Sequence, residues 1–140
     1  MKICIANDHA GYNLKLNIIK RFENKHNIID LGAESSDSVD YPDYAHKLAN
    51  YVSKNNVIGI LICGSGNGVS MAANKHTNIR AALCWNKEIS KLARLHNDAN
   101  VLSLPARYIT EDEANDIVDE FINTSFEGGR HQRRANKINC

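Results

Sequence analysis

The sequence predicts an α/β protein: a five-stranded parallel Rossmann-like sheet between two layers of helices, a three-layer α/β/α sandwich. Short apolar runs alternate with helical patterns along the chain, which is the order of βαβ units. The run Val57–Cys63 is apolar without interruption, as in strands that are covered on both faces. We therefore expect right-handed crossovers, and a ligand site beyond the carboxyl ends of the strands. This rule directs attention to the strand ends Asp8–His9, Cys63–Gly68 and Trp85–Asn86, and to the segments near His96 and Arg107.

The five expected strands are short, and the pattern leaves their order in the sheet open. Each is an apolar run that ends where glycine or polar residues begin, which is typical of strands in such proteins. They span Lys2–Ala6, Asn27–Leu31, Val57–Cys63, Ile79–Trp85 and Val101–Leu104.

Apolar residues at helical spacing fill the segments between these strands. We expect helices over about 11–24, from Pro42 to Val52, from the glycine-rich turn to about residue 75, and over Asn86–His96. Thr110 and Glu113 form a capping box that opens a further helix. The stripe that this helix buries is Ala114, Ile117, Val118, Phe121 and Ile122.

Length and composition indicate one domain over residues 1–140, with a basic tail over 127–140. Apolar residues make up 43%, which is enough for a core, and the net charge of +1 gives no reason to expect nucleic acid or a membrane as a partner. No apolar run is long enough to cross a bilayer, and we expect no signal peptide.

Cysteine usage predicts a reducing, cytoplasmic location. The four cysteines show neither a C-x-x-C pair nor metal-like spacing with the six histidines, so their spacing predicts no metal site. We also expect no cofactor. Two of the cysteines lie in apolar runs and resemble small buried hydrophobic residues. The cysteines are Cys4, Cys63, Cys84 and Cys140.

The turn Cys63–Gly68, with the sequence CGSGNG, is the strongest local feature. Its alternate glycines let the backbone approach a ligand, and its N–H groups with the following helix N-terminus can hold a phosphate or a developing oxyanion. The spacing is neither the dinucleotide fingerprint nor a P-loop, and a plain strand-to-helix connection is the alternative. For Cys63 we expect a favoured thiolate, with a buried structural cysteine as the alternative.

Two histidine segments also carry possible chemistry. Asp8 and His9 close the first strand, where they can bind sugar hydroxyls, although Asp8 also suits a helix N-cap. His96 ends a helix beside Asn97 and can act as a general acid, or be stabilised there by the helix dipole.

Arg130 and Arg134 are four residues apart in the basic tail, so a helix places both on one face. Two guanidinium groups there form a good clamp for a phosphate dianion. A solvated tail with weak nucleic-acid contacts is the alternative, although no interleaved aromatic residues support base stacking.

Taken together, these segments resemble the type B ribose-5-phosphate isomerases of the ribose/galactose-phosphate isomerase family. The matching segments run in the family's order and cover nearly the whole chain. They are Asp8–Gly11, Asp40–Pro42, Cys63–Gly68, Ala72–Lys75, Ile79–Ala81, His96–Asp98 and Gly129–Arg134.

The resemblance implies a metal-free enzyme that interconverts ribose 5-phosphate and ribulose 5-phosphate through a cis-enediolate. Cys63 matches the base that moves a proton between C1 and C2, and Ser65 matches the hydroxyl residue that handles the proton between O1 and O2. Asp8 and His96 match residues that bind and open the furanose ring. One branch of the family uses a glutamate after the glycine turn instead, but Val69 occupies that position here.

The resemblance also implies the substrate-binding set and the assembly. The amides of the glycine turn are expected to stabilise the enediolate oxygens, and further residues to bind the phosphate or line the sugar site. Family members are homodimers or dimers of dimers whose active sites contain residues of both subunits. The implied substrate-binding residues are Gly64, Gly66, Asn67 and Gly68 in the turn, His9, Arg107, Arg130 and Arg134 for the phosphate, and Tyr41 and Asn97 for the sugar.

Two other functions fit the same residues. A six-carbon isomerase of this family, for allose or galactose 6-phosphate, would use the same turn, and the loop at Trp85–Asn86 lies where it can limit substrate length. A non-catalytic sugar-phosphate-binding module on the same fold would bind without moving a proton.

Overall fold

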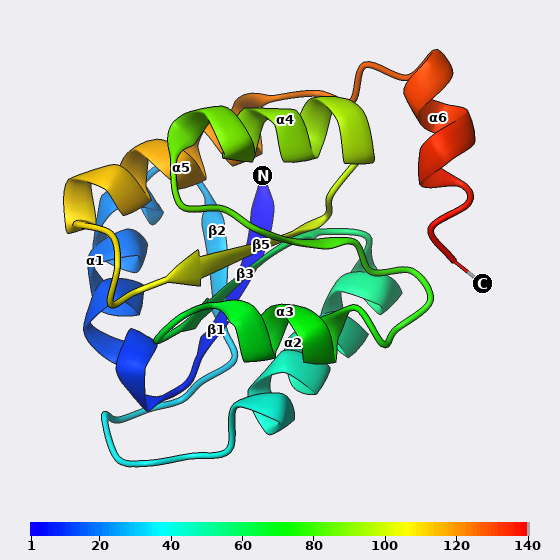
Figure 1. The fold of residues 1–140 in the computed structure, drawn as a ribbon. Helices are drawn as coiled ribbons and strands as arrows, with labels where there is room; N and C mark the ends of the chain where they lie inside the picture. The colour runs from blue at the N-terminus through cyan, green and yellow to red at the C-terminus, as the bar shows by residue number, and fades with distance from the viewer. Residues whose placement is uncertain (140) are drawn as a thin grey trace.

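The computed structural model describes residues 1–139, and its elements alternate as the sequence predicts (Figure 1). Cys140 lies outside the described residues. A short 3-10 turn, η1 (His9–Gly11), joins β1 to α1. The strands are β1 (Lys2–Asn7), β2 (Asn27–Asp30), β3 (Ile58–Cys63), β4 (Ala81–Leu83) and β5 (Val101–Pro105). The helices are α1 (Tyr12–Phe22), α2 (Tyr41–Asn55), α3 (Asn67–Ala73), α4 (Lys87–Asn97), α5 (Glu111–Asn123) and α6 (Arg130–Ala135).

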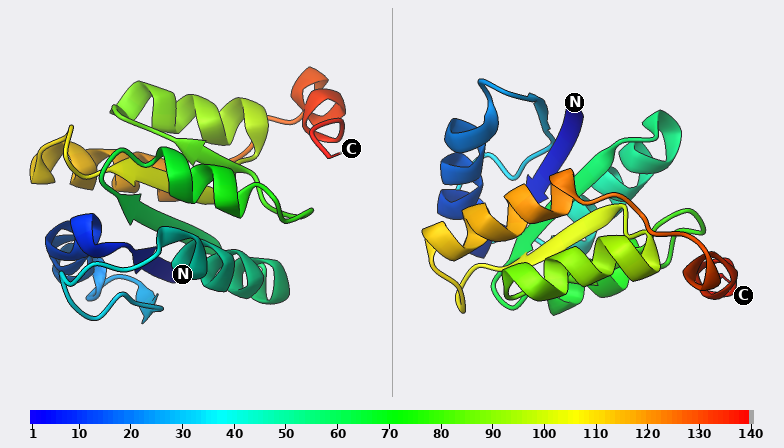
Figure 2. Two further views of the ribbon diagram at one scale, coloured as in Figure 1. Left: turned by 60° about the horizontal axis from the view of Figure 1, so that its bottom comes forward. Right: turned by 90° about the horizontal axis from the view of Figure 1, so that it is seen from above.

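The five strands form one parallel sheet in the order β2-β1-β3-β5-β4. Helices α1, α4 and α5 pack on one face and α2 and α3 on the other, so the sheet is the middle layer of the predicted sandwich (Figures 1 and 2). β1 and β3 are neighbours, yet the helices that follow them lie on opposite faces. The carboxyl ends of these two strands therefore border the crevice where ligands bind in open α/β sheets.

β3 explains why a continuous apolar run predicted a central strand. Ile60 and Ile62 enter the core under α1 and α5, and Leu61 and Cys63 enter the core under α2 and α3. Because both faces are covered, β3 has no solvent-facing row that would take polar residues.

The capping box and the buried stripe of α5 are confirmed. Thr110 Oγ1 accepts the N–H of Glu113, and the Glu113 carboxylate accepts the N–H of Thr110. The helix buries all five apolar residues that the sequence assigns to its inner face. Within residues 1–139, no helix combines the length and apolar character needed to span a membrane.

The fourth strand is shorter than predicted, because β4 is an edge strand that pairs only with β5, over three residues. Asparagine side chains form hydrogen bonds with the backbone N–H groups at its start. Asn100 Oδ1 accepts the N–H of Arg80, and Asn74 Oδ1 accepts the N–H of Ala81. Trp85 lies beyond the strand and is exposed.

Candidate active site

The crevice between β1 and β3 contains a cavity of about 240 Å³. Asp8 follows β1 directly and Cys63 closes β3, so the sheet brings together two residues that are 55 positions apart in the chain. Tyr108, which follows Arg107 in the chain, also lines the cavity and was not predicted as a site residue. Its position shortly after the end of a strand was the signal that could have identified it. The lining residues are Asp8, His9, Ala10, Cys63, Gly64, Ser65, Arg107 and Tyr108.

Asp8 holds both the chain turn and the thiol. Its Oδ1 accepts the backbone N–H of Ala10 at 2.9 Å and of Gly11 at 3.2 Å, and it thereby caps η1. Its Oδ2 accepts a hydrogen bond from Cys63 Sγ at 3.0 Å. The two interpretations of Asp8, as a cap and as a site residue, are therefore compatible in one side chain.

The expected preference of Cys63 for the thiolate is wrong for this structure. Burial raises the pKa of the Cys63 thiol, and the hydrogen bond to Asp8 and the charge of Asp8 raise it further. Hydrogen bonds from the amides of Gly66 and Gly64 lower it, but by less. Because the thiol faces a carboxylate among apolar side chains, it keeps its proton at neutral pH and donates it to Asp8.

Cys63 still differs from the other described cysteines. Burial raises the pKa values of Cys4 and Cys84 to about 12, and neither residue lines the cavity. Cys63 is 8% exposed and opens on that cavity beside two amides that stabilise a sulfur anion. It is therefore the described thiol best placed to react.

The glycine turn has the conformation that only glycine allows without strain. Gly66 has a φ of +75°, and a Cβ there would lie 2.5 Å from Leu83 Cδ1. A Cβ on Gly68 would lie 2.7 Å from the ring of Tyr41, which places that ring against the turn. The turn is thus packed closely between β4 and the start of α2, with Ser65 and Asn67 exposed.

Two of the predicted phosphate-binding residues reach the cavity. Arg107 crosses Gly64 closely enough that a Cβ on that glycine would lie 3.3 Å from the arginine Cδ. His9 borders the cavity, and its Nδ1 accepts the N–H of Val39 at 3.4 Å. An exposed guanidinium and an imidazole beside the turn's amides are suited to an anion.

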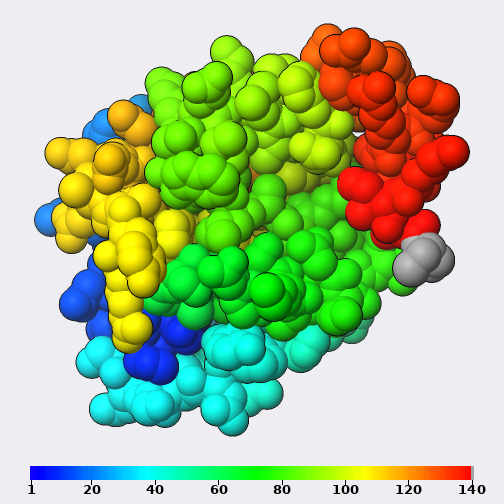
Figure 3. Space-filling model, viewed as in Figure 1, coloured from blue at the N-terminus to red at the C-terminus, as the bar shows by residue number. Residues whose placement is uncertain are grey.

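Four predicted site residues lie at the opposite edge of the sheet. α4 runs antiparallel to the strands, so His96 and Asn97 lie near their amino ends, where α6 carries Arg130 and Arg134. The two edges are roughly 17 Å apart, because β3 has 6 residues and the strand rises about 3.3 Å from each residue to the next. In Figure 3, α6 and the segment between β5 and α5 lie on opposite sides of the molecule. The expectation that the segment near His96 lies at the carboxyl edge is therefore wrong within one chain.

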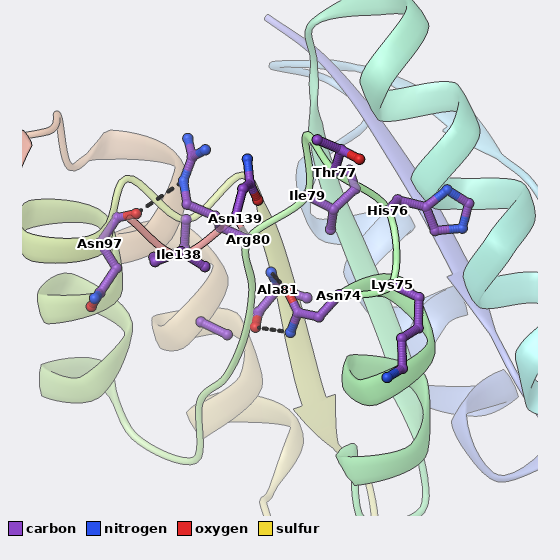
Figure 4. Close-up of a pocket in the computed structure, with 12 residues that line it drawn as sticks. Asn74, Lys75, His76, Thr77, Ile79, Arg80, Ala81, Asn97, Ile138 and Asn139 are labelled. Atoms are coloured by element: carbon purple, nitrogen blue, oxygen red, sulfur yellow. Dashed lines mark hydrogen bonds between the residues drawn. The ribbon is translucent and has the colours of Figure 1, made fainter. Parts of the chain in front are cut away.

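A second cavity, of about 370 Å³, opens at this amino edge between the loop after α3 and the C-terminal segment (Figure 4). Lys75, His76, Arg80 and Asn97 are among its lining residues. The Arg80 guanidinium is already engaged: it donates to the carboxylate of Asp98 at 2.8 Å and to the Asn97 carbonyl at 3.0 Å. Neither the thiol nor the glycine turn reaches this cavity, so the smaller cavity is the candidate active site.

The family model described as Ribose/Galactose Isomerase matches residues 3–138. The chain belongs to this family. It is 51% identical over 139 residues to the probable ribose-5-phosphate isomerase B of Mycoplasma pneumoniae, covering 97% of this chain and 91% of that protein.

Solved structures of this isomerase family share the whole fold. Ribose-5-phosphate isomerase B of Clostridium thermocellum superposes with a TM-score of 0.96 at 46% identity, covering 99% of this chain and 95% of the other. Ribose-5-phosphate isomerase B of Mycoplasma genitalium, solved with bound ribulose-5-phosphate, has a TM-score of 0.94 at 48% identity and covers 98% and 93%. The predicted fold and family are both confirmed.

The pH dependence of Cys63 alkylation tests the geometry of the thiol. The rate of reaction with iodoacetamide should rise with pH around a midpoint above that of an ordinary cysteine, because burial and Asp8 disfavour the thiolate. Asp8→Asn should lower that midpoint, whereas Asp116→Asn, on the exposed side of α5, should leave it in place. A midpoint that stays the same in Asp8→Asn would show that the carboxylate does not act on the thiol.

Proposed function

We propose that this chain interconverts ribose 5-phosphate and ribulose 5-phosphate by moving a proton between C1 and C2 through a cis-enediolate. The observation that carries the proposal is the 3.0 Å hydrogen bond from Cys63 to Asp8, beside the glycine turn and at the sheet crevice. The family and the relative solved with bound ribulose-5-phosphate support the substrate. The reaction needs no metal or cofactor.

The hydrogen bond from Cys63 to Asp8 supplies the route by which the base is generated, although the raised pKa of the thiol opposes this step until the sugar binds. The thiol gives its proton to Asp8 when the sugar enters, and the amides of Gly64 and Gly66 stabilise the resulting thiolate. The thiolate removes the proton from C2 and returns it to C1, and Asp8 then gives the first proton back to sulfur. Proton number is conserved, and Asp8 also binds the ring hydroxyls.

The exposed parts of the turn stabilise the intermediate in this proposal. Ser65 moves the proton between O1 and O2, and the amides of the turn, including those of Asn67 and Gly68, hold the enediolate oxygens. Negative charge develops at these oxygens, and losing one such donor typically costs about 3–4 kcal/mol of transition-state stabilisation. Tyr41, packed against Gly68, lines the sugar site.

A complete site needs two copies of the chain. His96, Asn97, Arg130 and Arg134 are placed too far from Cys63 to serve the same sugar, since the length of β3 separates the edges. A two-fold dimer, or a dimer of dimers, brings the amino edge of one copy to the carboxyl edge of the other. His96 then opens the ring in the partner's cavity.

The phosphate then lies between basic groups from both copies. His9 and Arg107 come from the copy that supplies the thiol, and Arg130 and Arg134 from its partner. Exposed Met71 and Trp85, at 65% and 54% of their surface, offer apolar area for a contact between the two copies.

We propose that the whole chain acts as a single isomerase domain in the cytoplasm, without nucleic acid or membrane as a partner.

Replacing the base should remove most of the turnover and keep binding. Cys63→Ala should lower kcat by roughly 10²–10⁴-fold, the usual contribution of a positioned acid or base. The phosphate contacts remain, so ribose 5-phosphate should still bind. Cys84→Ala, at a buried thiol away from the cavity, should keep its activity. The measurement is a coupled assay with added chelator, and a fully active Cys63→Ala enzyme would refute the assignment of the base.

Complementation tests the shared site. Cys63→Ala and His96→Ala chains should each be inactive alone, but a heterodimer of the two contains one site with both native residues. Random pairing makes about half of the dimers heterodimers, and each heterodimer has one intact site of its two. About a quarter of wild-type activity should therefore return on co-expression. No recovery would mean that both residues serve a site within one chain.

A further inference from the structure

Three metal-binding side chains meet where the end of α4 contacts the start of α6. His96 Nε2 lies 3.7 Å from Glu127 Oε2, and His131 Nε2 lies 3.8 Å from the same oxygen. The three atoms all lie within 4.8 Å of one another. The two imidazole rings stack, with centroids 4.2 Å apart and planes 7° from parallel.

The backbone around this cluster is held in place. The N–H of Glu127 donates to the Leu95 carbonyl at 3.1 Å, which ties the segment to the last turn of α4. The His131 side chain is only 8% exposed, packed where α6 contacts α4, whereas His96 and Glu127 are 38% and 58% exposed. One ligand is therefore fixed in the protein while the other two face solvent, which leaves a path for an ion.

We propose that His96, Glu127 and His131 bind a divalent transition-metal ion of the zinc class, and that this ion inhibits the enzyme. Two imidazoles and one carboxylate form a set that zinc uses with water in its fourth position. Calcium and magnesium prefer all-oxygen sites, so two nitrogen ligands select against them. The chain's proposed isomerase chemistry has no use for the ion.

Side-chain rotations are needed to close the site. Zinc bonds of about 2.0–2.2 Å place tetrahedral ligand atoms roughly 3.3–3.6 Å apart, so each histidine nitrogen must approach Glu127 Oε2 by a few tenths of an ångström. The stack must also open so that both lone pairs converge, and His96 is the ring that turns, because it is 38% exposed and the χ2 torsion of histidine is soft. Arg130, whose Nε lies 3.5 Å from His131 Nε2, must swing away, and its side chain is exposed.

The inhibition follows from the proposed function and rests on it. The ion would coordinate the imidazole of His96, which opens the sugar ring in the proposed reaction. It would also displace the Arg130 guanidinium, which binds the phosphate. Metal and sugar phosphate therefore exclude each other, which predicts inhibition that is competitive with ribose 5-phosphate and reversed by a chelator.

Calorimetric titration of Zn²⁺ into the chain tests the site without any reference to activity. It is done in the Cys63→Ala background, which removes the cavity thiol as a competing ligand. One ion per chain should bind, and Glu127→Gln or His131→Ala should weaken binding by at least about 100-fold. Even mutation of a residue that only hydrogen-bonds to a metal ligand typically lowers metal affinity by about 10–100-fold. Bound Co²⁺ in the wild-type chain should show no thiolate-to-metal charge-transfer band.

His76→Ala is the matched control, because His46 and His76 form the other close histidine pair, 2.9 Å apart between Nδ1 and Nε2. It should leave affinity for Zn²⁺ unchanged. The site is refuted if His76→Ala abolishes binding, if Glu127→Gln and His131→Ala both keep full affinity, or if no ion binds once Cys63 is removed.

Kinetics then tests the regulatory half of the proposal. Glu127→Gln should keep turnover and lose its sensitivity to Zn²⁺, while His76→Ala should stay sensitive. Calorimetric binding without competitive inhibition would overturn the inhibitory role. If the wild-type chain turned over no ribose 5-phosphate even with chelator, the proposed function would fail, while the titration would still decide the metal site.

Discussion

The hydrogen bond from Cys63 to Asp8 is the contact on which the proposed chemistry of this chain depends. It exists because β1 and β3 are neighbours whose following helices leave the sheet on opposite faces. The same carboxylate caps η1 through two backbone N–H groups, so the position of the thiol's partner is fixed by chain geometry. A shift of either strand would therefore alter the distance between Cys63 and Asp8.

Much of the fold, and several of the residues that line the cavity at the carboxyl edge, could be predicted from local pattern. The uninterrupted apolar run of β3 predicted a central strand, and the capping box predicted where α5 begins, because both signals depend on neighbours in the sequence. The rule that ligands bind beyond the strand ends directed attention to Asp8 and Cys63. These features are properties of short segments, and short segments are what a sequence describes well.

The failures arise from long-range geometry. The pKa of Cys63 depends on a carboxylate 55 residues away and on burial, so the nearby helix N-terminus alone predicted the wrong direction. His96 ends α4, and a helix that joins two parallel strands returns the chain to the amino edge of the sheet, so the predicted parallel topology already implied the position of His96. His96, Glu127 and His131 lie together because α6 packs on α4. Their spacing in the sequence matches no metal-binding motif, so the sequence alone did not reveal the cluster.

The division of polar residues between two edges also gives the chain its logic as an enzyme. The carboxyl edge holds Cys63 and the glycine turn, the proposed base and oxyanion donors, and the amino edge holds His96 with Arg130 and Arg134, the proposed ring-opening acid and phosphate clamp. The most direct test of the central claim follows the carbon-bound proton itself. In deuterated water, the wild-type enzyme should exchange the C2 proton of ribose 5-phosphate with solvent, as seen by proton NMR, and Cys63→Ala should bind the sugar without exchange. Exchange at the wild-type rate in Cys63→Ala would contradict the account.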